Sequence, residues 1–432
     1  MRGLVIGPQR TVIERLVVER LGNRGEGVAL LGGRRVFIPY ALAGETVTAE
    51  IDGEHARLVD IVEASPQRIA AICPHFEDCG GCAVQTLRAD AYAAWKRSLV
   101  ETALINAGLT LDVAPTVDAH GAGRRRVTFH ARFDAGQARV GYMAARSHRI
   151  VEIEACPVLA PELAGALPAA RAIAAIFAPR GKPLDIAVTA TLGGLDVELR
   201  GGGPLSETET GALLAAADAH DLARLTNHGK LIALRRAPQV KIGEATLTLP
   251  PGVFLQATQA GEETLAARVL SATAKAQNVA DLFCGVGAFA LRLARRAQVK
   301  AYDTDAGALA AMRAAAHATP GLRTLEDVTR DLFTRPLSAS ELNGFDAVVF
   351  DPPRAGAAAQ AAEIARSEVP IVVAVSCHAQ SFARDAAILL KGGYVIREIT
   401  PLDQFRYAAH VEIVAVFEKA SGRKSAKRRL LG

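Results

Sequence analysis

Four short apolar segments in the C-terminal half of the chain each end at a residue suited to binding or chemistry. The segments are 279–283, 299–302, 347–350 and 371–376, and the residues at their ends are Phe283, Asp303, Asp351 and Cys377. Helical stretches such as 288–297 and 306–318 lie between them. Strands that alternate with helices predict an α/β fold with a doubly wound parallel sheet. Ligands bind such a sheet at the carboxyl ends of its strands, so these four residues are expected at one edge.

A glycine-containing loop, Asp281-Leu-Phe-Cys-Gly-Val-Gly287, follows the first segment. It lacks the third glycine of a dinucleotide-binding loop, because Ala290 stands in that place. Asp303 ends the next strand, where a carboxylate typically holds ribose hydroxyls; a turn or cap role is the alternative. We interpret Cys284 as a small packing residue rather than a ligand or nucleophile.

This loop, Asp303 and the sequence Asp351-Pro352-Pro353 together resemble the motifs of class I S-adenosylmethionine-dependent methyltransferases. The resemblance implies a Rossmann-like domain that binds S-adenosylmethionine. It also implies that Asp331, in Thr329-Arg-Asp-Leu-Phe333, lies on the adenine side of the cofactor. Methyltransferases of exocyclic amines carry an aromatic residue after the two prolines, whereas this chain has Arg354, which argues against a planar amine as the target.

Six cysteines need an explanation other than disulfides. The N-terminal residues do not fit a secretory signal and no segment fits a membrane helix, so we expect a cytoplasmic protein with no membrane partner. Cys73, Cys79 and Cys82 are closely spaced, with two glycines in the last gap, and Cys156 offers a fourth thiolate. Three clustered cysteines plus a distant one favour a 4Fe–4S cluster. Zinc and a chance grouping remain alternatives.

The chain divides into four predicted parts. About five short strands in residues 11–63 predict a small closed barrel of the oligonucleotide-binding type, with any other small β domain as the alternative. The predicted ranges are 1–66 for the barrel, 67–239 for a central α+β domain with the cysteines, 240–420 for the cofactor domain and 421–432 for a basic tail. The tail carries the whole formal charge of +5. The alternative is that this tail is simply a disordered basic end.

Local charge is more informative than the total. Residues 121–150 hold seven arginines and one acid, Asp134. The arginines are at positions 124, 125, 126, 132, 139, 146 and 149. Such a segment can contact RNA phosphates without reading sequence, and a solvated strand face is the alternative.

A cysteine and a glutamate suit methylation of a pyrimidine carbon. Cys377 follows Ser376 at a strand end, and Glu412 begins an apolar final strand. A thiolate that attacks C6 of uracil turns C5 into a nucleophile, and a carboxylate is then needed to remove the C5 proton. The alternatives are a buried structural cysteine and a solvent-facing glutamate.

Taken together, these residues resemble the RNA 5-methyluridine methyltransferases. Within that family the chain is similar to the ribosomal-RNA uracil-C5 group, which carries a TRAM barrel and a 4Fe–4S cluster. The motifs are CPHFEDCGGC, RRRVTF, FLQ, DLFCGVG, DPPRAG, SCHAQSFARD and HVEIVAVF. The resemblance implies cluster ligands at Cys73, Cys79, Cys82 and Cys156, cofactor contacts at Gln256, Phe283, Asp303 and Asp351, a nucleophile at Cys377 and a base at Glu412. This sequence departs from the family at Ala288, often asparagine, and at His378-Ala379, often Asn-Pro.

We therefore expect a monomeric enzyme that methylates uracil C5 in structured RNA, most simply 23S ribosomal RNA. Transfer RNA is an alternative substrate, because members that act on it share the catalytic motifs. A cytosine-C5 methyltransferase is a rival, although those enzymes usually carry the nucleophile after proline or threonine. An iron–sulfur RNA-binding protein without turnover is a rival of another class.

Overall fold

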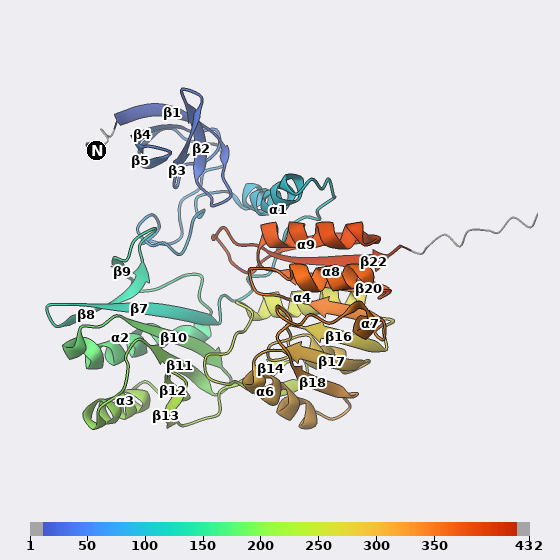
Figure 1. The fold of residues 1–432 in the computed structure, drawn as a ribbon. Coiled ribbons are helices and arrows are strands. Elements are labelled where there is room, and N and C mark those ends of the chain that lie inside the picture. The colour runs from blue at the N-terminus through green and yellow to red at the C-terminus, as the bar shows by residue number, and fades with distance from the viewer. Residues whose placement is uncertain (1–11, 421–432) are drawn as a thin grey trace, which may run out of the picture.

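A closed five-stranded barrel begins the part of the chain, residues 12–420, that the computed structural model describes (Figure 1). Its strands are β1 (Val12–Leu21), β2 (Gly27–Leu31), β3 (Arg34–Ile38), β4 (Thr46–Asp52) and β5 (His55–Glu63), in the order β1-β2-β3-β5-β4. In β4, alternate residues Val47, Ala49 and Ile51 point into the core, as the sequence pattern indicates. The predicted small barrel is therefore confirmed, whereas the predicted tail at 421–432 lies outside the described residues.

A seven-stranded sheet forms the centre of the chain. Its order is β13-β12-β11-β10-β7-β8-β9. The strands are β7 (Arg126–Asp134), β8 (Gln137–Met143), β9 (Ile150–Glu152), β10 (Leu184–Thr191), β11 (Gly194–Arg200), β12 (Arg224–Asn227) and β13 (Lys230–Leu234). Helices α2 (Ala166–Phe177) and α3 (Glu207–Ala219) pack against each other, and α2 contacts β8 and β10.

Two prolines lie near the start of α2. A short 3-10 turn, η1 (Pro161–Leu163), precedes α2, and Pro168 is the third residue of α2. The first backbone N–H groups of a helix have no acceptor within it, so a proline there causes no kink. The stretch 161–180 is long and apolar enough to cross a membrane by length and composition alone. In the structure its buried side chains, including Ile173 and Phe177, belong to the core of this region.

An eight-stranded sheet carries the C-terminal half, in the order β18-β17-β16-β19-β20-β22-β21-β6. The strands are β16 (Asn278–Leu282), β17 (Gln298–Asp303), β18 (Leu325–Thr329), β19 (Ala347–Phe350), β20 (Ile371–Ser376), β21 (Tyr394–Asp403), β22 (Glu412–Lys419) and β6 (Val117–Asp118). The first five strands in this order, from β18 through β17, β16 and β19 to β20, are parallel, as predicted. Strand β22 is antiparallel to both of its neighbours. A separate hairpin, β14 (Gln239–Ile242) with β15 (Ala245–Thr248), precedes this sheet.

Helices cover both faces of this sheet. They are α4 (Gln259–Ala272), α5 (Ala290–Leu293), α6 (Ala306–His317), α7 (Ala339–Leu342), α8 (Ala358–Arg366) and α9 (Ala379–Lys391). In β19, Val348 and Phe350 enter one core cluster and Ala347 and Val349 enter the other, so the strand is buried on both sides. The helix predicted over 288–297 is only one α-helical turn, α5, because the backbone that follows shifts to tighter i→i−3 hydrogen bonds.

Helix α1 (Ala89–Asn106) and strand β6 come from the range predicted as the central domain, yet both lie on the C-terminal sheet. Helix α1 contacts α9 and β21, and it lies beside α9 in Figure 1. Trp95 and Leu99 share a core cluster with Phe382 of α9. The predicted ranges were drawn along the sequence, whereas α1 and β6 join the C-terminal sheet through contacts in space.

Candidate active site

One cavity of about 630 Å³ gathers six of the seven residues predicted to bind the cofactor or to react. They are Gln256, Phe283, Asp303, Asp351, Cys377 and Glu412. The cavity lies at the carboxyl ends of β16, β17, β19 and β20, where the strand order reverses and ligands bind α/β sheets. Asp331 does not line it. The Asp331 carboxylate accepts hydrogen bonds from Phe333 N at 2.9 Å and Thr334 Oγ1 at 2.8 Å, so it caps its own turn.

The glycine loop owes its shape to backbone torsions that few residues adopt. Phe283 has a φ of 61°, which is rare for a bulky residue and marks a constrained site. Gly287 has a φ of 84°, and a Cβ there would lie 2.5 Å from Met312 Sδ. Asp303 holds the loop, because its Oδ2 accepts from Gly285 N at 2.8 Å. Its Oδ1 accepts from Asp305 N at 2.9 Å, and each oxygen keeps a lone pair for a further donor.

Two carboxyl groups of the cavity, the buried Glu412 and the partly buried Asp351, are joined through two amides. Gln256 Nε2 donates to Asp351 Oδ2 at 3.0 Å, and Gln404 Nε2 donates to Gln256 Oε1 and Glu412 Oε2, both at 2.8 Å. Burial raises the pKa of Asp351, and burial together with the charge of Asp351 raises the pKa of Glu412. The sequence motifs do not include Gln404, since nothing in its spacing from Gln256 or Glu412 marks it.

Cys377 lies at the end of β20, next to this chain of amides. Burial and the negative charges of Glu412 and Asp351 raise the pKa of its thiol to about 11, against the opposing charge of Arg354. The thiol of the free protein is therefore neutral at ordinary pH. His378 takes no part in this, because its ring caps α9 by accepting from Ser381 N at 3.4 Å.

A second cavity, of about 220 Å³, is lined by all four predicted metal ligands, Cys73, Cys79, Cys82 and Cys156. Burial raises the pKa of the Cys82 thiol to about 11. Gly80 lets the loop dock on the end of β8, because a Cβ there would lie 2.9 Å from Met143 O. Between residues 12 and 420, no group of three or more His, Cys, Asp or Glu side chains is arranged to hold a single metal ion.

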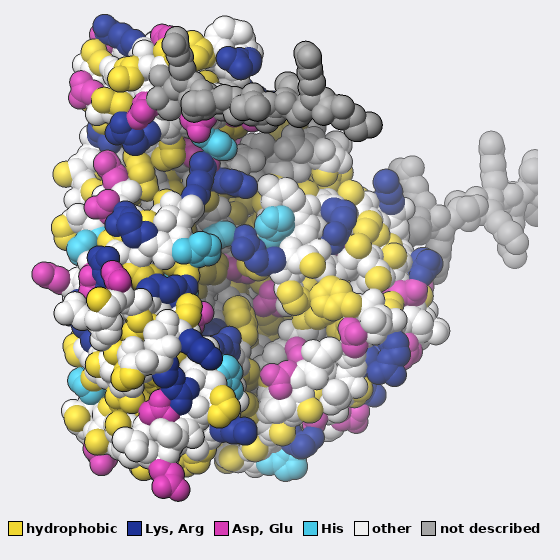
Figure 2. Space-filling model, turned by 60° about the vertical axis from the view of Figure 1, so that its left-hand side comes forward, with side chains coloured by type: hydrophobic (Ala, Val, Ile, Leu, Met, Phe, Trp, Pro, Cys, Tyr) yellow, Lys and Arg dark blue, Asp and Glu magenta, His cyan; other side chains and the backbone are white. Residues whose placement is uncertain are grey.

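Several arginines of the 121–150 segment are paired with acids from elsewhere in the chain. Arg125 is 8% exposed and pairs with Glu262 of α4, so it is not available to RNA phosphates. The others that pair with acids outside the segment are Arg139 with Glu152, Arg146 with Glu26 and Arg149 with Asp78. These three arginines are about half exposed, and such surface pairs exchange readily with other anions. On the face shown in Figure 2, Lys and Arg side chains line a hollow that runs down the molecule.

Comparisons with known proteins agree with this architecture. The TRAM domain family matches residues 12–55, and the methyltransferase small domain family matches residues 244–369. An RNA methyltransferase of Brucella suis, described as uncharacterized, is 45% identical over 94% of this chain and 97% of its own length. The 23S rRNA (uracil(1939)-C(5))-methyltransferase RlmD of Pseudomonas fluorescens is 35% identical over 94% of each chain.

A solved structure has the same fold over nearly the whole chain. The tRNA (uracil-54, C5)-methyltransferase of Pyrococcus abyssi, bound to S-adenosyl-L-homocysteine, superposes with a TM-score of 0.71 at 22% identity. The match covers 93% of this chain and 99% of that one. With relatives of this identity and coverage, the chain belongs to the RNA (uracil-C5)-methyltransferase family.

Proposed function

We propose that this enzyme transfers a methyl group from S-adenosylmethionine to C5 of a uracil in structured RNA through a covalent bond between Cys377 and C6. The observation that carries the proposal is the meeting of Cys377, Glu412 and Asp351 in the cavity that also contains the glycine loop. A nucleophile and a base on one wall of a cofactor cavity suit a reaction at a carbon that needs activation and then deprotonation.

The residues of the cavity fit S-adenosylmethionine. Asp303 keeps free lone pairs for ribose hydroxyls, and the Asp351 carboxyl group suits a positively charged donor. When bound, S-adenosylmethionine supplies an electrophilic methyl group on a positively charged sulfur. A positive charge in this cavity lowers the pKa of Cys377, Asp351 and Glu412 alike, so we expect the Cys377 thiolate to form once the cavity is filled.

The proposed methyl transfer has three steps, and each electron pair is accounted for. The Cys377 thiolate attacks C6 of uracil, and the C5–C6 double bond moves its pair to C5 as an enolate. C5 then takes the methyl group, and the pair of the broken carbon–sulfur bond leaves with S-adenosylhomocysteine. Glu412 removes the C5 proton, the C5–C6 double bond forms again and the thiolate leaves. The target base has to leave any stack to reach Cys377.

The decisive experiment compares wild-type protein with Cys377→Ala and Glu412→Gln on total RNA from a strain that lacks the gene. We expect the wild type to form 5-methyluridine, Cys377→Ala to form neither product nor adduct, and Glu412→Gln to accumulate a covalent RNA complex. Product from Cys377→Ala would contradict the mechanism, and 5-methylcytidine from the wild type would contradict the target base.

We propose ribosomal RNA of the large subunit as the substrate and a monomer as the active form. The support is the 35% identical relative, whose name gives 23S rRNA as its substrate, together with the N-terminal barrel. The barrel and the exposed arginines would bind phosphates and position the RNA. Mapping 5-methyluridine in the RNA of the deletion strain decides between ribosomal and transfer RNA.

We further propose that Cys73, Cys79, Cys82 and Cys156 hold a 4Fe–4S cluster. A zinc ion requires four cysteine sulfurs at about 2.3 Å from one point. In a 4Fe–4S cluster each cysteine binds a different iron, so the four cysteine sulfurs surround a larger space. The four cysteines do line one cavity. Iron and acid-labile sulfide measured per chain test the proposal, and stoichiometric zinc without sulfide would refute it.

A further inference from the structure

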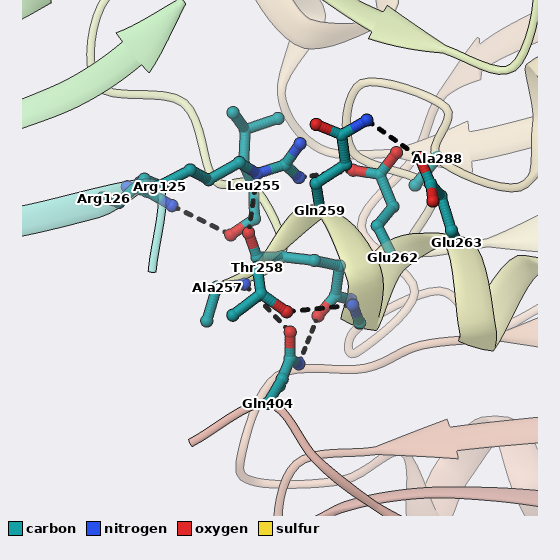
Figure 3. A network of polar contacts seen from close by, with 12 residues as sticks. Arg125, Arg126, Leu255, Ala257, Thr258, Gln259, Glu262, Glu263, Ala288 and Gln404 are labelled. Carbon is teal, nitrogen blue, oxygen red and sulfur yellow. Dashed lines mark hydrogen bonds and ion pairs between the residues drawn. The ribbon is translucent and has the colours of Figure 1, made fainter. Parts of the chain in front are cut away.

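Gln404 connects parts of the site that are far apart in the sequence. It follows β21, is 1% exposed and makes three hydrogen bonds with its side chain, of which Figure 3 shows the one with Ala257. Two bonds are donated, to Gln256 Oε1 and Glu412 Oε2, and one is accepted, from Ala257 N at 3.0 Å. Gly261 makes room for it, because a Cβ there would lie 2.6 Å from Gln404 Oε1.

The orientation of this amide follows from its partners. Ala257 N is a backbone donor, so only the oxygen of the Gln404 amide can face it. The nitrogen must then face Gln256 and Glu412, and both of its hydrogens are used. A rotated amide would lose all three bonds inside a buried site.

The backbone around Ala257 is itself fixed. Arg125 Nε donates to Gln256 O at 3.0 Å and its guanidinium pairs with the buried Glu262, as Figure 3 shows. Thr258 Oγ1 donates to Ala119 O at 2.6 Å and accepts from Gly261 N at 2.9 Å. The rigid segment around Ala257 therefore fixes the side-chain oxygen of Gln404. The side-chain nitrogen of the same amide is thereby directed toward Glu412 Oε2.

A carboxyl group held in this way has two unlike oxygens. Oε2 of Glu412 accepts from Gln404 and must remain an acceptor whether or not Glu412 is protonated. Oε1 makes no hydrogen bond with any residue between 12 and 420, and the residue lines the cavity. A proton taken up by Glu412 thus belongs on Oε1.

We propose that Gln404 is a positioning residue that reserves Oε1 of Glu412 for removal of the C5 proton. This inference rests on the proposed function, because it concerns the deprotonation step. The titratable groups that face Glu412 are Asp351 from the end of β19 and Cys377 from the end of β20, with Arg354 beside the latter. The hydrogen bond from Gln404 lowers the pKa of Glu412 and so opposes burial and Asp351.

The test is Gln404→Met, which keeps the length of the side chain and removes its hydrogen bonds. We expect kcat to fall about 100-fold, the loss typical of a misplaced catalytic group. The acid limb of the kcat–pH profile should move to higher pH, since Glu412 loses a donor that favours its carboxylate. The covalent RNA complex should accumulate, because deprotonation slows while thiolate attack does not. Adding Gln404→Met to Glu412→Gln should cause little further loss.

The controls separate positioning from folding. Gln360 is a buried glutamine that bonds Leu337 N and O away from the cavity, so Gln360→Met should leave the pH profile unchanged. RNA with 5-fluorouridine traps the adduct because fluorine cannot be removed as a proton, and Gln404→Met should form it at the wild-type rate. Slow trapping would refute the proposal, and so would a wild-type kcat and pH profile in Gln404→Met. A wild-type enzyme that makes no 5-methyluridine would instead refute the proposed function.

Discussion

Lys96 of α1 is fully buried, and its replacement by methionine gives the sharpest test of how this site is supported. Its ammonium pairs with Asp403 Oδ1 at 2.8 Å and also donates to the carbonyls of Phe405 and His410. These acceptors flank the loop that contains Gln404 and leads to Glu412. One side chain therefore holds both ends of this loop, and Lys96→Met removes all three bonds without a large change in volume.

The expected loss in unfolding free energy follows from the burial of the ion pair between Lys96 and Asp403. Breaking a buried ion pair from one side costs about 3–5 kcal/mol, because the remaining charge stays buried without its partner. Tyr92 Oη still donates to Asp403 Oδ2 at 2.7 Å, so we expect the lower part of this range for the loss in unfolding free energy. Lys300→Met is the matched control. Lys300 pairs with Glu326 at 3.5 Å where both side chains are exposed, and such pairs contribute about 0–1 kcal/mol.

The chain provides its own probe for this measurement. Trp95 is its single tryptophan, is buried and precedes Lys96. Urea unfolding followed by tryptophan fluorescence therefore reports on this helix. The double variant Lys96→Met with Asp403→Asn should recover part of the loss, since no uncompensated charge remains. A loss below about 1 kcal/mol for Lys96→Met, or no recovery in the double variant, would refute the reasoning.

Other predictions test the remaining parts of the site. The rate of alkylation of Cys377 should be slow at neutral pH and rise toward pH 11. A cationic cofactor analogue should move this rise to lower pH, whereas S-adenosylhomocysteine, whose sulfur is uncharged, should not. Gly287→Ala should weaken cofactor binding about 5- to 150-fold by calorimetry, the range that corresponds to backbone strain of about 1–3 kcal/mol. Cys82→Ser should lower iron content. Arg149→Gln should reduce the salt slope of RNA binding by about 1, whereas deleting 421–432 should change it much less.

The strand ends could be read from the sequence because their signal is local. Each of β17, β19 and β20 is a short apolar run with a polar residue at or after its end, and both faces of the sheet are covered. Asp303, Asp351 and Cys377 were therefore expected at one edge, and all three line the cavity.

Other features depend on contacts that no local pattern encodes. Gln404 meets Gln256 across 148 positions of the chain, so its spacing carries no information. The charge of the 121–150 segment was counted along the chain, whereas its arginines pair in space with acids such as Glu262 and Glu26. Residues 89–106 fall within the range 67–239 predicted for the central domain, but the apolar residues of α1 pack on α9.

Helix α1 contacts both the barrel and the loop that contains Gln404. Trp95 Nε1 donates to Gly22 O between β1 and β2 of the barrel at 3.2 Å, and the next residue, Lys96, holds the loop that contains Gln404. Neighbouring residues of one rigid helix thus contact both parts. A shift of α1 by the barrel on RNA would move the ammonium of Lys96, and through this loop the orientation of Glu412. The barrel thus contacts the helix that also holds this loop, although none of the described barrel residues, 12–63, lines the cavity.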